Sequence, residues 1–99
     1  MDYKHLDKHN ETYKTHKDLI ERLNGLLDDF EASREDFNSL VDYYYSDQFR
    51  KDFEDSNQGK IGDDINQGLL TEDTIYDLIG DDYYLALRLL DLANKMIQK

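Results

Sequence analysis

Apolar residues recur with a seven-residue period over the first half of the chain. One position of the repeat holds Leu6, Tyr13, Ile20, Leu27, Arg34 and Val41, the position three residues on holds His9, His16, Leu23, Phe30, Phe37 and Tyr44, and Leu19, Leu26 and Leu40 widen the stripe. This pattern is typical of a helix that turns a three-residue-wide apolar face towards the core of a bundle. It predicts a long N-terminal helix.

An unbroken helix from residue 6 to residue 44 would be about 60 Å long, at 1.5 Å per residue. That length exceeds a compact domain of 99 residues. We therefore expect one of two arrangements. Either residues 1–17, where apolar residues are few, project or fray, or the helix bends between Glu31 and Asp36, where Ser33 and Arg34 interrupt the stripe.

The helical period is lost over residues 46–68. Phe49, Phe53, Ile61 and Ile65 are spaced like anchors of an irregular segment, and Gly59, Gly62 and Gly68 mark turns within it. This stretch predicts an irregular connection that aromatic and aliphatic side chains hold onto the helices.

Two further helices are predicted after this connection. Thr71 is a suitable N-cap for a short helix that Gly80 ends, and Asp81 or Asp82 caps a last helix that runs to about Gln98. Because apolar residues cover most of the last helix, we expect it to be the most buried element. The fold prediction is all-α in a single helical domain, residues 1–99, with a long N-terminal helix packed against a short helix and a buried C-terminal helix.

Acidic residues are concentrated in one part of the chain. The whole chain carries 23 acidic and 12 basic residues, a net charge of −11, whereas residues 28–91 carry eighteen acidic and five basic residues, a net charge of −13. A strong field of one sign costs a small domain self-repulsion. The concentration therefore indicates either a basic partner or a role in solubility.

Composition and local sequence exclude several classes of protein. The chain has no cysteine, which removes disulfides, thiolate catalysis and cysteine-based zinc sites. The charged residues 1–10 do not form a signal peptide, and no apolar run is long enough to span a membrane, so we expect a cytoplasmic protein. Direct binding to nucleic acid or to a membrane is not expected, because phosphate contacts require Lys and Arg.

Metal-binding patterns are incomplete. His5 and His9 are four residues apart and His16 lies one heptad beyond His9, but no third ligand completes the local pattern. Residues 54–65 superficially resemble a calcium loop, yet Ile65 stands where the closing bidentate Glu belongs. We therefore predict no metal and no other cofactor.

Catalytic motifs are missing as well. None of the serines lies in a Gly-x-Ser-x-Gly elbow, and no Gly-rich phosphate loop is present. Carboxylate pairs are frequent, but eighteen acids in 64 positions produce pairs by chance. We predict a protein that is not an enzyme and has no catalytic residue.

Tyrosines stand beside carboxylates at two places, at residues 43–45 and at residues 83 and 84. Two interpretations stay open. The rings wall off the segment that contains Phe49 and Phe53, or exposed rings beside acidic residues form a binding surface for a basic protein, since tyrosine is enriched at binding hot spots. The second interpretation makes these the candidate partner-binding residues: Asp42, Tyr43, Tyr45, Asp47, Asp63, Asp64, Asp81, Asp82 and Tyr83.

Residues 43–79 resemble a small bacterial domain family of unknown function. The shared pattern is a tyrosine pair, a serine, an aromatic-x-x-Asp-aromatic stretch, a Gly-Lys turn, a Gly-Leu-Leu-Thr-Glu-Asp run and a tyrosine before two apolar residues; here it consists of Tyr43, Tyr44, Ser46, Phe49, Asp52, Phe53, Gly59, Lys60, Gly68, Leu69, Leu70, Thr71, Glu72, Asp73, Tyr76, Leu78 and Ile79. The chain departs from it at Phe49, Phe53, Gly62 and Gln67, where the family has Trp, Tyr, Pro and Arg. The resemblance implies a helical fold and no activity.

The function expected from these observations is binding. An acidic module without catalytic motifs suits the basic groove of a nuclease or another nucleic-acid-binding protein, which it would inhibit by imitating phosphate charge. Small phage proteins that disarm bacterial nucleases, including anti-CRISPR proteins, resemble this chain in size and charge. The alternative is a non-catalytic housekeeping helical domain that is acidic only for solubility and that self-associates, with a homodimer as the partner state.

Overall fold

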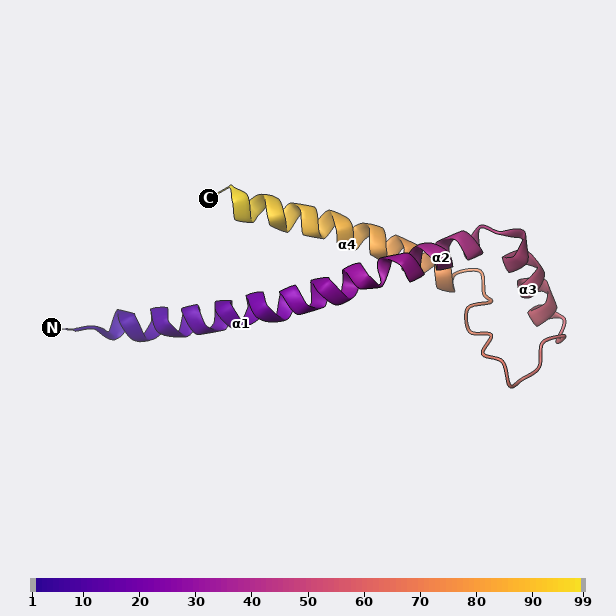
Figure 1. The fold of residues 1–99 in the computed structure, drawn as a ribbon, viewed down its shortest axis with the longest axis horizontal. Coiled ribbons are helices and arrows are strands. Elements are labelled where there is room, and N and C mark those ends of the chain that lie inside the picture. The colour runs from indigo at the N-terminus through magenta and orange to yellow at the C-terminus, as the bar shows by residue number, and fades with distance from the viewer. Residues whose placement is uncertain (1, 99) are drawn as a thin grey trace. The chain divides into compact units, whose positions relative to one another are not determined.

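The computed structural model describes residues 2–98 and contains four helices among them, α1 (Lys4–Ala32), α2 (Arg34–Tyr44), α3 (Asp47–Asn57) and α4 (Thr74–Ile97) (Figure 1). The described residues form no strand, which confirms the all-α prediction. The chain divides into two compact units, Met1–Phe37 and Asn38–Lys99. The first unit contains α1 and the start of α2; the second contains the rest of α2, α3, the connection and α4.

The N-terminal helix is interrupted between Glu31 and Asp36, as in the second of the two expected arrangements. Ser33 separates α1 from α2, and its hydroxyl donates a hydrogen bond of 2.8 Å to the carbonyl oxygen of Phe30. Such a bond back to the preceding turn competes with the helical pattern and often bends a helix. The backbone N–H of Phe37 still bonds to the carbonyl of Ser33, so the interruption is confined to one residue.

A third helix, α3, replaces the first half of the predicted irregular connection at residues 46–68, so the prediction was wrong for that half. Ser46 is the N-cap of α3, and its hydroxyl accepts a hydrogen bond from the backbone N–H of Phe49. At the other end Gly59 adopts a positive φ of 70°, and the N–H of Lys60 bonds back to the carbonyl of Asp55 at 2.9 Å. This is the Schellman arrangement that commonly ends helices, and it favours glycine because other residues are strained at this φ.

Salt bridges between side chains one helical turn apart stabilise α3 at its surface. Arg50 pairs with Asp47 at 2.6 Å and Lys51 with Asp55 at 3.0 Å. Pairs at these spacings stabilise a helix by a few tenths of a kcal/mol each. They explain why a segment with few apolar residues is helical.

The irregular connection is therefore limited to residues 58–73, and Gln67 organises it. Its side-chain oxygen accepts a hydrogen bond from the Ser56 hydroxyl at 2.5 Å, and its side-chain nitrogen lies 3.2 Å from the carbonyl of Gly62 and 3.4 Å from that of Ile61. One amide thus ties the connection both to itself and to α3.

The core of the second unit is small and aromatic. Phe49 is 8% exposed and Ile75 is 1% exposed; they are the buried apolar residues of the described chain. The ring of Phe49 lies 5.5 Å from that of Tyr43, 5.1 Å from that of Tyr44 and 6.2 Å from that of Phe53, measured between centroids. Distances in this range are favourable for aromatic pairs, so this cluster joins α2 to α3.

The C-terminal half of the chain differs from the prediction in two ways. Gly80 does not end a helix, because α4 continues through it from Thr74 to Ile97, and Asp81 and Asp82 are interior residues rather than caps. The last helix is also not the most buried element: Ile75 is its buried residue, and all residues from 83 to 98 are exposed. The second unit buries too few residues to cover the apolar side chains that surround most of α4.

Candidate functional site

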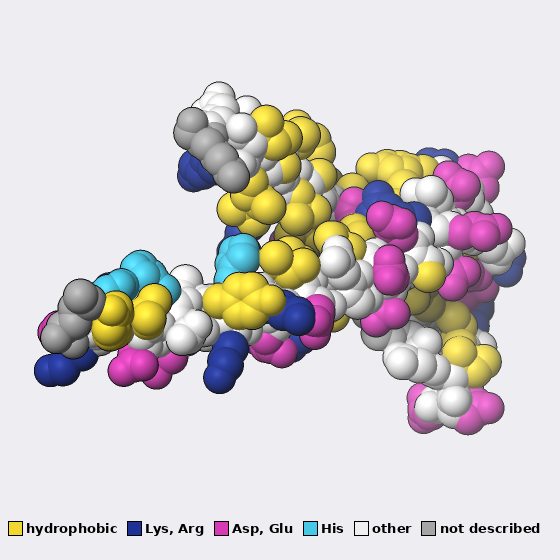
Figure 2. Space-filling model, turned by 60° about the vertical axis from the view of Figure 1, so that its left-hand side comes forward, with side chains coloured by type: hydrophobic (Ala, Val, Ile, Leu, Met, Phe, Trp, Pro, Cys, Tyr) yellow, Lys and Arg dark blue, Asp and Glu magenta, His cyan; other side chains and the backbone are white. Residues whose placement is uncertain are grey.

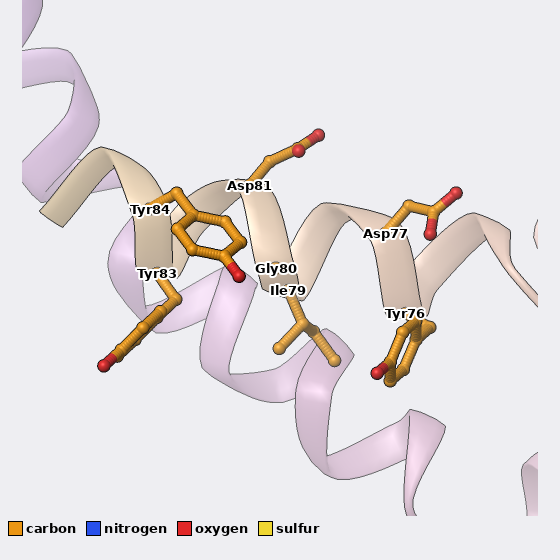
Figure 3. A pocket seen from close by; sticks show the side chains of 7 residues that line it. All are labelled: Tyr76, Asp77, Ile79, Gly80, Asp81, Tyr83 and Tyr84. Carbon is orange, nitrogen blue, oxygen red and sulfur yellow. The ribbon is translucent and has the colours of Figure 1, made fainter. Parts of the chain in front are cut away.

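An open depression lies on α4 around Gly80. Its volume is about 670 Å³, and α4 alone supplies the residues that line it: Tyr76, Asp77, Ile79, Gly80, Asp81, Tyr83 and Tyr84 (Figure 3). A Cβ atom placed on Gly80 would meet nothing within 4 Å. The absent side chain therefore leaves a notch in the helix surface, and the helical spacing arranges its neighbours around that notch.

Aromatic and acidic side chains take different sides of the notch. Figure 3 shows Asp77 and Asp81 pointing to one side of the helix and Tyr76, Ile79 and Tyr83 to the other, with the ring of Tyr84 between the two groups. Because one helical residue turns about 100°, positions 77, 81 and 84 share one face and positions 76, 79 and 83 the next.

The tyrosines of the notch are open to solvent. Tyr76 and Tyr83 are each 61% exposed and Tyr84 is 69% exposed. The rings of Tyr83 and Tyr84 lie 5.8 Å apart in an edge-to-face arrangement at 70°. This pair presents ring faces and hydroxyl groups outwards rather than to a core.

The carboxylates of the notch have no cationic partner within the described chain. Asp18, Asp47, Asp55 and Asp91 form ion pairs with basic side chains of the chain, but within residues 2–98 neither Asp77 nor Asp81 does. Ring faces attract cations, and carboxylates bind guanidinium and ammonium groups through charge-assisted hydrogen bonds. The arrangement is suited to a lysine or arginine side chain from another molecule.

The structure places the nine predicted binding residues at three locations. Asp81 and Tyr83 line the notch on α4, and the half-buried Asp82 lies between them in the sequence without lining it. Asp63 and Asp64 lie exposed in the connection. The other four, Asp42, Tyr43, Tyr45 and Asp47, lie around the turn between α2 and α3.

Tyr43 faces the aromatic core rather than solvent. Its hydroxyl donates a hydrogen bond of 2.6 Å to the carboxylate of Asp52, and its ring meets Phe49 edge to face. Burial, followed by the hydrogen bond to Asp52, raises the pKa of Tyr43 to about 12. The same hydrogen bond lowers the pKa of Asp52. The interpretation that tyrosines wall off the Phe49 segment therefore describes Tyr43.

Tyr45 and Asp47 remain at the surface of this turn. Tyr45 is 67% exposed, and its ring lies 5.0 Å from that of Tyr44. Asp47 is bonded to Arg50 of its own helix, so part of its charge is already compensated. This turn offers a weaker attraction for a cation than the notch on α4.

Sequence reasoning missed five residues of the notch: Tyr76, Asp77, Ile79, Gly80 and Tyr84. Their spacing of four residues, from 76 to 80 and from 80 to 84, would have placed them together on one helix. The signal was hidden because Gly80 was interpreted as the end of one helix and Asp81 as the start of another.

The histidines of α1 do not form a metal site in the described residues. The rings of His5 and His9 lie 6.4 Å apart, and no group of three or more His, Cys, Asp or Glu side chains within residues 2–98 is placed to hold an ion. No helix of this described part combines the length and apolar character that a membrane span requires.

Comparisons with known proteins identify a family but no characterised relative. No curated protein matches the chain, and no solved structure does. A family model does match, over residues 6–92, which includes all of α2, α3 and the notch and nearly all of α1. Because the match covers most of the chain, this protein belongs to the family described as "Domain of unknown function (DUF4298)".

Proposed function

We propose that this protein is a small, non-catalytic, acidic binding module that occupies the basic nucleic-acid-binding surface of another protein and inhibits it. The observation that carries the proposal is the notch on α4, where exposed tyrosines stand beside two carboxylates that have no cation in the described chain. A nuclease or another nucleic-acid-binding protein presents the complementary groups, because its own ligand is a phosphate backbone.

Recognition of a single cation is the first step of the argument. A lysine or arginine over an exposed tyrosine ring gains about 0.5–1 kcal/mol. Asp77 and Asp81 lie one helical turn apart, about 6 Å along the axis, so both can approach one guanidinium or two neighbouring basic residues. The notch at Gly80 gives the incoming side chain room between the two groups.

The second step is the field of the surrounding surface. The unit Asn38–Lys99 contains thirteen acidic and six basic residues, a net charge of −7. Acidic side chains gather around the part of the molecule formed by α3 and the connection (Figure 2). A field of this sign accelerates encounter with a basic surface and repels nucleic acid and acidic proteins.

The test is capture of nucleic-acid-binding proteins from a cell lysate on the immobilised chain at low salt, followed by kinetics with the captured protein. Tyr83→Ala should accelerate release, and a hot-spot loss of about 2 kcal/mol corresponds to a roughly 30-fold higher Kd. Asp81→Asn should mainly slow association.

Two variants on the same helix are matched controls. Leu90→Ala removes a side chain that is 69% exposed and lies beyond the notch, and Asp91→Asn removes a carboxylate that pairs with Lys95. Both should bind like the unmodified chain. If no nucleic-acid-binding protein is retained at low salt, the proposal fails. The alternative, a housekeeping domain that is acidic only for solubility, expects all four variants to remain folded and functional, with lower solubility only for the two that lose a carboxylate.

A further inference from the structure

The apolar stripe of α1 has no cover in its own unit. None of the 29 residues of α1 is buried. Seven of its large apolar side chains are between 37% and 65% exposed, and Leu27 is half-buried; the seven are Leu6, Tyr13, Leu19, Ile20, Leu23, Leu26 and Phe30. Apolar side chains lie open at the surface beside the histidines of this helix (Figure 2). A continuous apolar stripe of this length marks an interaction surface.

The stripe has a defined end. The guanidinium of Arg34 lies 5.3 Å from the ring centroid of Phe30 and 4.9 Å from that of Phe37. A cation at this heptad position stops the apolar seam, because burying it in a helix interface would be costly. The usable seam therefore runs from Leu6 to Phe30, three and a half heptads.

We propose that α1 pairs with α1 of a second copy of this chain in an antiparallel coiled coil. The seam is symmetric about its centre. When the two copies are aligned so that Leu6 lies opposite Phe30, Tyr13 lies opposite Leu23, Ile20 opposite His16 and Leu27 opposite His9. Each of these pairs joins a residue of the Leu6 heptad position to a residue of the His9 heptad position, as in antiparallel coiled coils. Leu19 then lies close to the two-fold axis, near Leu19 of the second copy.

The charges of α1 favour this direction. Residues 4–17 carry four basic and two acidic residues, net +2, and residues 18–32 carry one basic and five acidic residues, net −4. Antiparallel pairing brings opposite charges together at both ends, whereas parallel pairing sets −4 against −4. Complementary charges along the flanks of a seam decide partner and orientation.

Site-directed cross-linking tests the proposal, because the chain contains no cysteine of its own. A disulfide requires Cα atoms about 4.4–6.8 Å apart. Leu19→Cys should therefore cross-link to itself under mild oxidation. Leu6→Cys should not, since 24 residues of helix, about 36 Å, separate the two copies of this position, but a mixture of Leu6→Cys and Phe30→Cys should form a mixed dimer.

Sedimentation gives an independent readout. The unmodified chain should show twice its 11.8 kDa mass, and Leu23→Asp should lose the dimer while keeping its helical circular dichroism. Leu92→Asp on α4 is the matched control, since Leu92 is 47% exposed and Leu23 46%, and it should leave the dimer intact. If Leu23→Asp loses helicity, the cross-linking experiment tests the pairing of the two copies instead.

A monomer across the concentration series, self-cross-linking of Leu6→Cys, or loss of the dimer in Leu92→Asp would each overturn the proposal. The test concerns the first unit, so its outcome is independent of binding at the notch.

Discussion

Truncation of Phe49 is the most direct test of the fold. Phe49→Ala removes a ring that is 8% exposed and has three aromatic neighbours with centroids between 5.1 and 6.2 Å away. Replacing a buried Phe by Ala costs about 3–5 kcal/mol, which includes the lost burial and the cavity left behind. Whole domains are stable by only about 5–15 kcal/mol. Because Phe49 and Ile75 are the only buried residues among residues 2–98, this change should remove a large share of the free energy of unfolding of the second unit.

Thermal unfolding measures this loss. For a unit of this size, 1 kcal/mol shifts the melting temperature by about 4–8 °C, so a loss of 3 kcal/mol predicts a fall of about 12–24 °C. Near-ultraviolet circular dichroism of the tyrosines follows mainly the second unit, since it contains six of the eight tyrosines and two of them, Tyr43 and Tyr44, contact Phe49.

Tyr45→Ala is the control for size and chemistry. Tyr45 belongs to the same unit, is 67% exposed, and contacts the ring of Tyr44. Its truncation should cost about 1 kcal/mol or less. Equal shifts for the two variants would refute the reasoning, because they would show that the Phe49 cluster is not the core.

Three further predictions concern single contacts. Stability from the Tyr43–Asp52 pair should be complete from neutral pH to about pH 10 and decrease as the pH rises towards about 12, because the folded state holds the pKa of Tyr43 above its ordinary value of 10.0. Urea titrations of Tyr43→Phe over this range should show a smaller decrease than those of the unmodified chain. Ser46→Ala should lower the stability of α3 by about 1 kcal/mol, measured by thermal unfolding, whereas Ser46→Thr should retain most of it. Gly80→Ala should raise the melting temperature, since alanine gains about 1 kcal/mol in a helix interior and its Cβ meets no atom, and the same change should weaken partner binding by narrowing the notch. A lower melting temperature would contradict the helical assignment of Gly80.

The N-terminal half of the fold could be predicted because its signals are periodic. The heptad from Leu6 to Tyr44 predicted a helix, and the break of the stripe at Ser33 and Arg34 indicated an interruption there as one of two alternatives. Both depend on local sequence alone. Local sequence does not specify which other surface packs against the apolar stripe of α1. The helix was expected to face a core, but none of its residues is buried.

The second half was harder because individual residues give ambiguous signals. Ser46 and the four-residue spacing of Phe49 and Phe53 suit a helix, but few apolar residues in this segment disguise the period. Glycine is compatible with a helix end and with a helix interior. Here α4 continues through Gly80, although glycine in a helix interior is less stable than alanine by about 1 kcal/mol.

The candidate site was predicted only in part for the same reason. Asp81 and Tyr83 were identified from composition, as a tyrosine beside carboxylates. Their grouping with Tyr76 and Asp77 required knowledge that α4 is continuous. Conversely, the half-buried position of Tyr43 depends on its contacts with Phe49 and Asp52, which no sequence pattern specified.

The central claim is that the acidic, tyrosine-lined face of α4 takes the place of nucleic acid on a basic protein. The measurement that tests it most directly is competition between this chain and duplex DNA for the captured protein, across a series of salt concentrations. Exposed charges interact over about 8 Å at physiological ionic strength, so the account predicts mutually exclusive binding and a Kd that rises steeply with salt. A ternary complex with DNA, or a Kd that salt does not change, would contradict it.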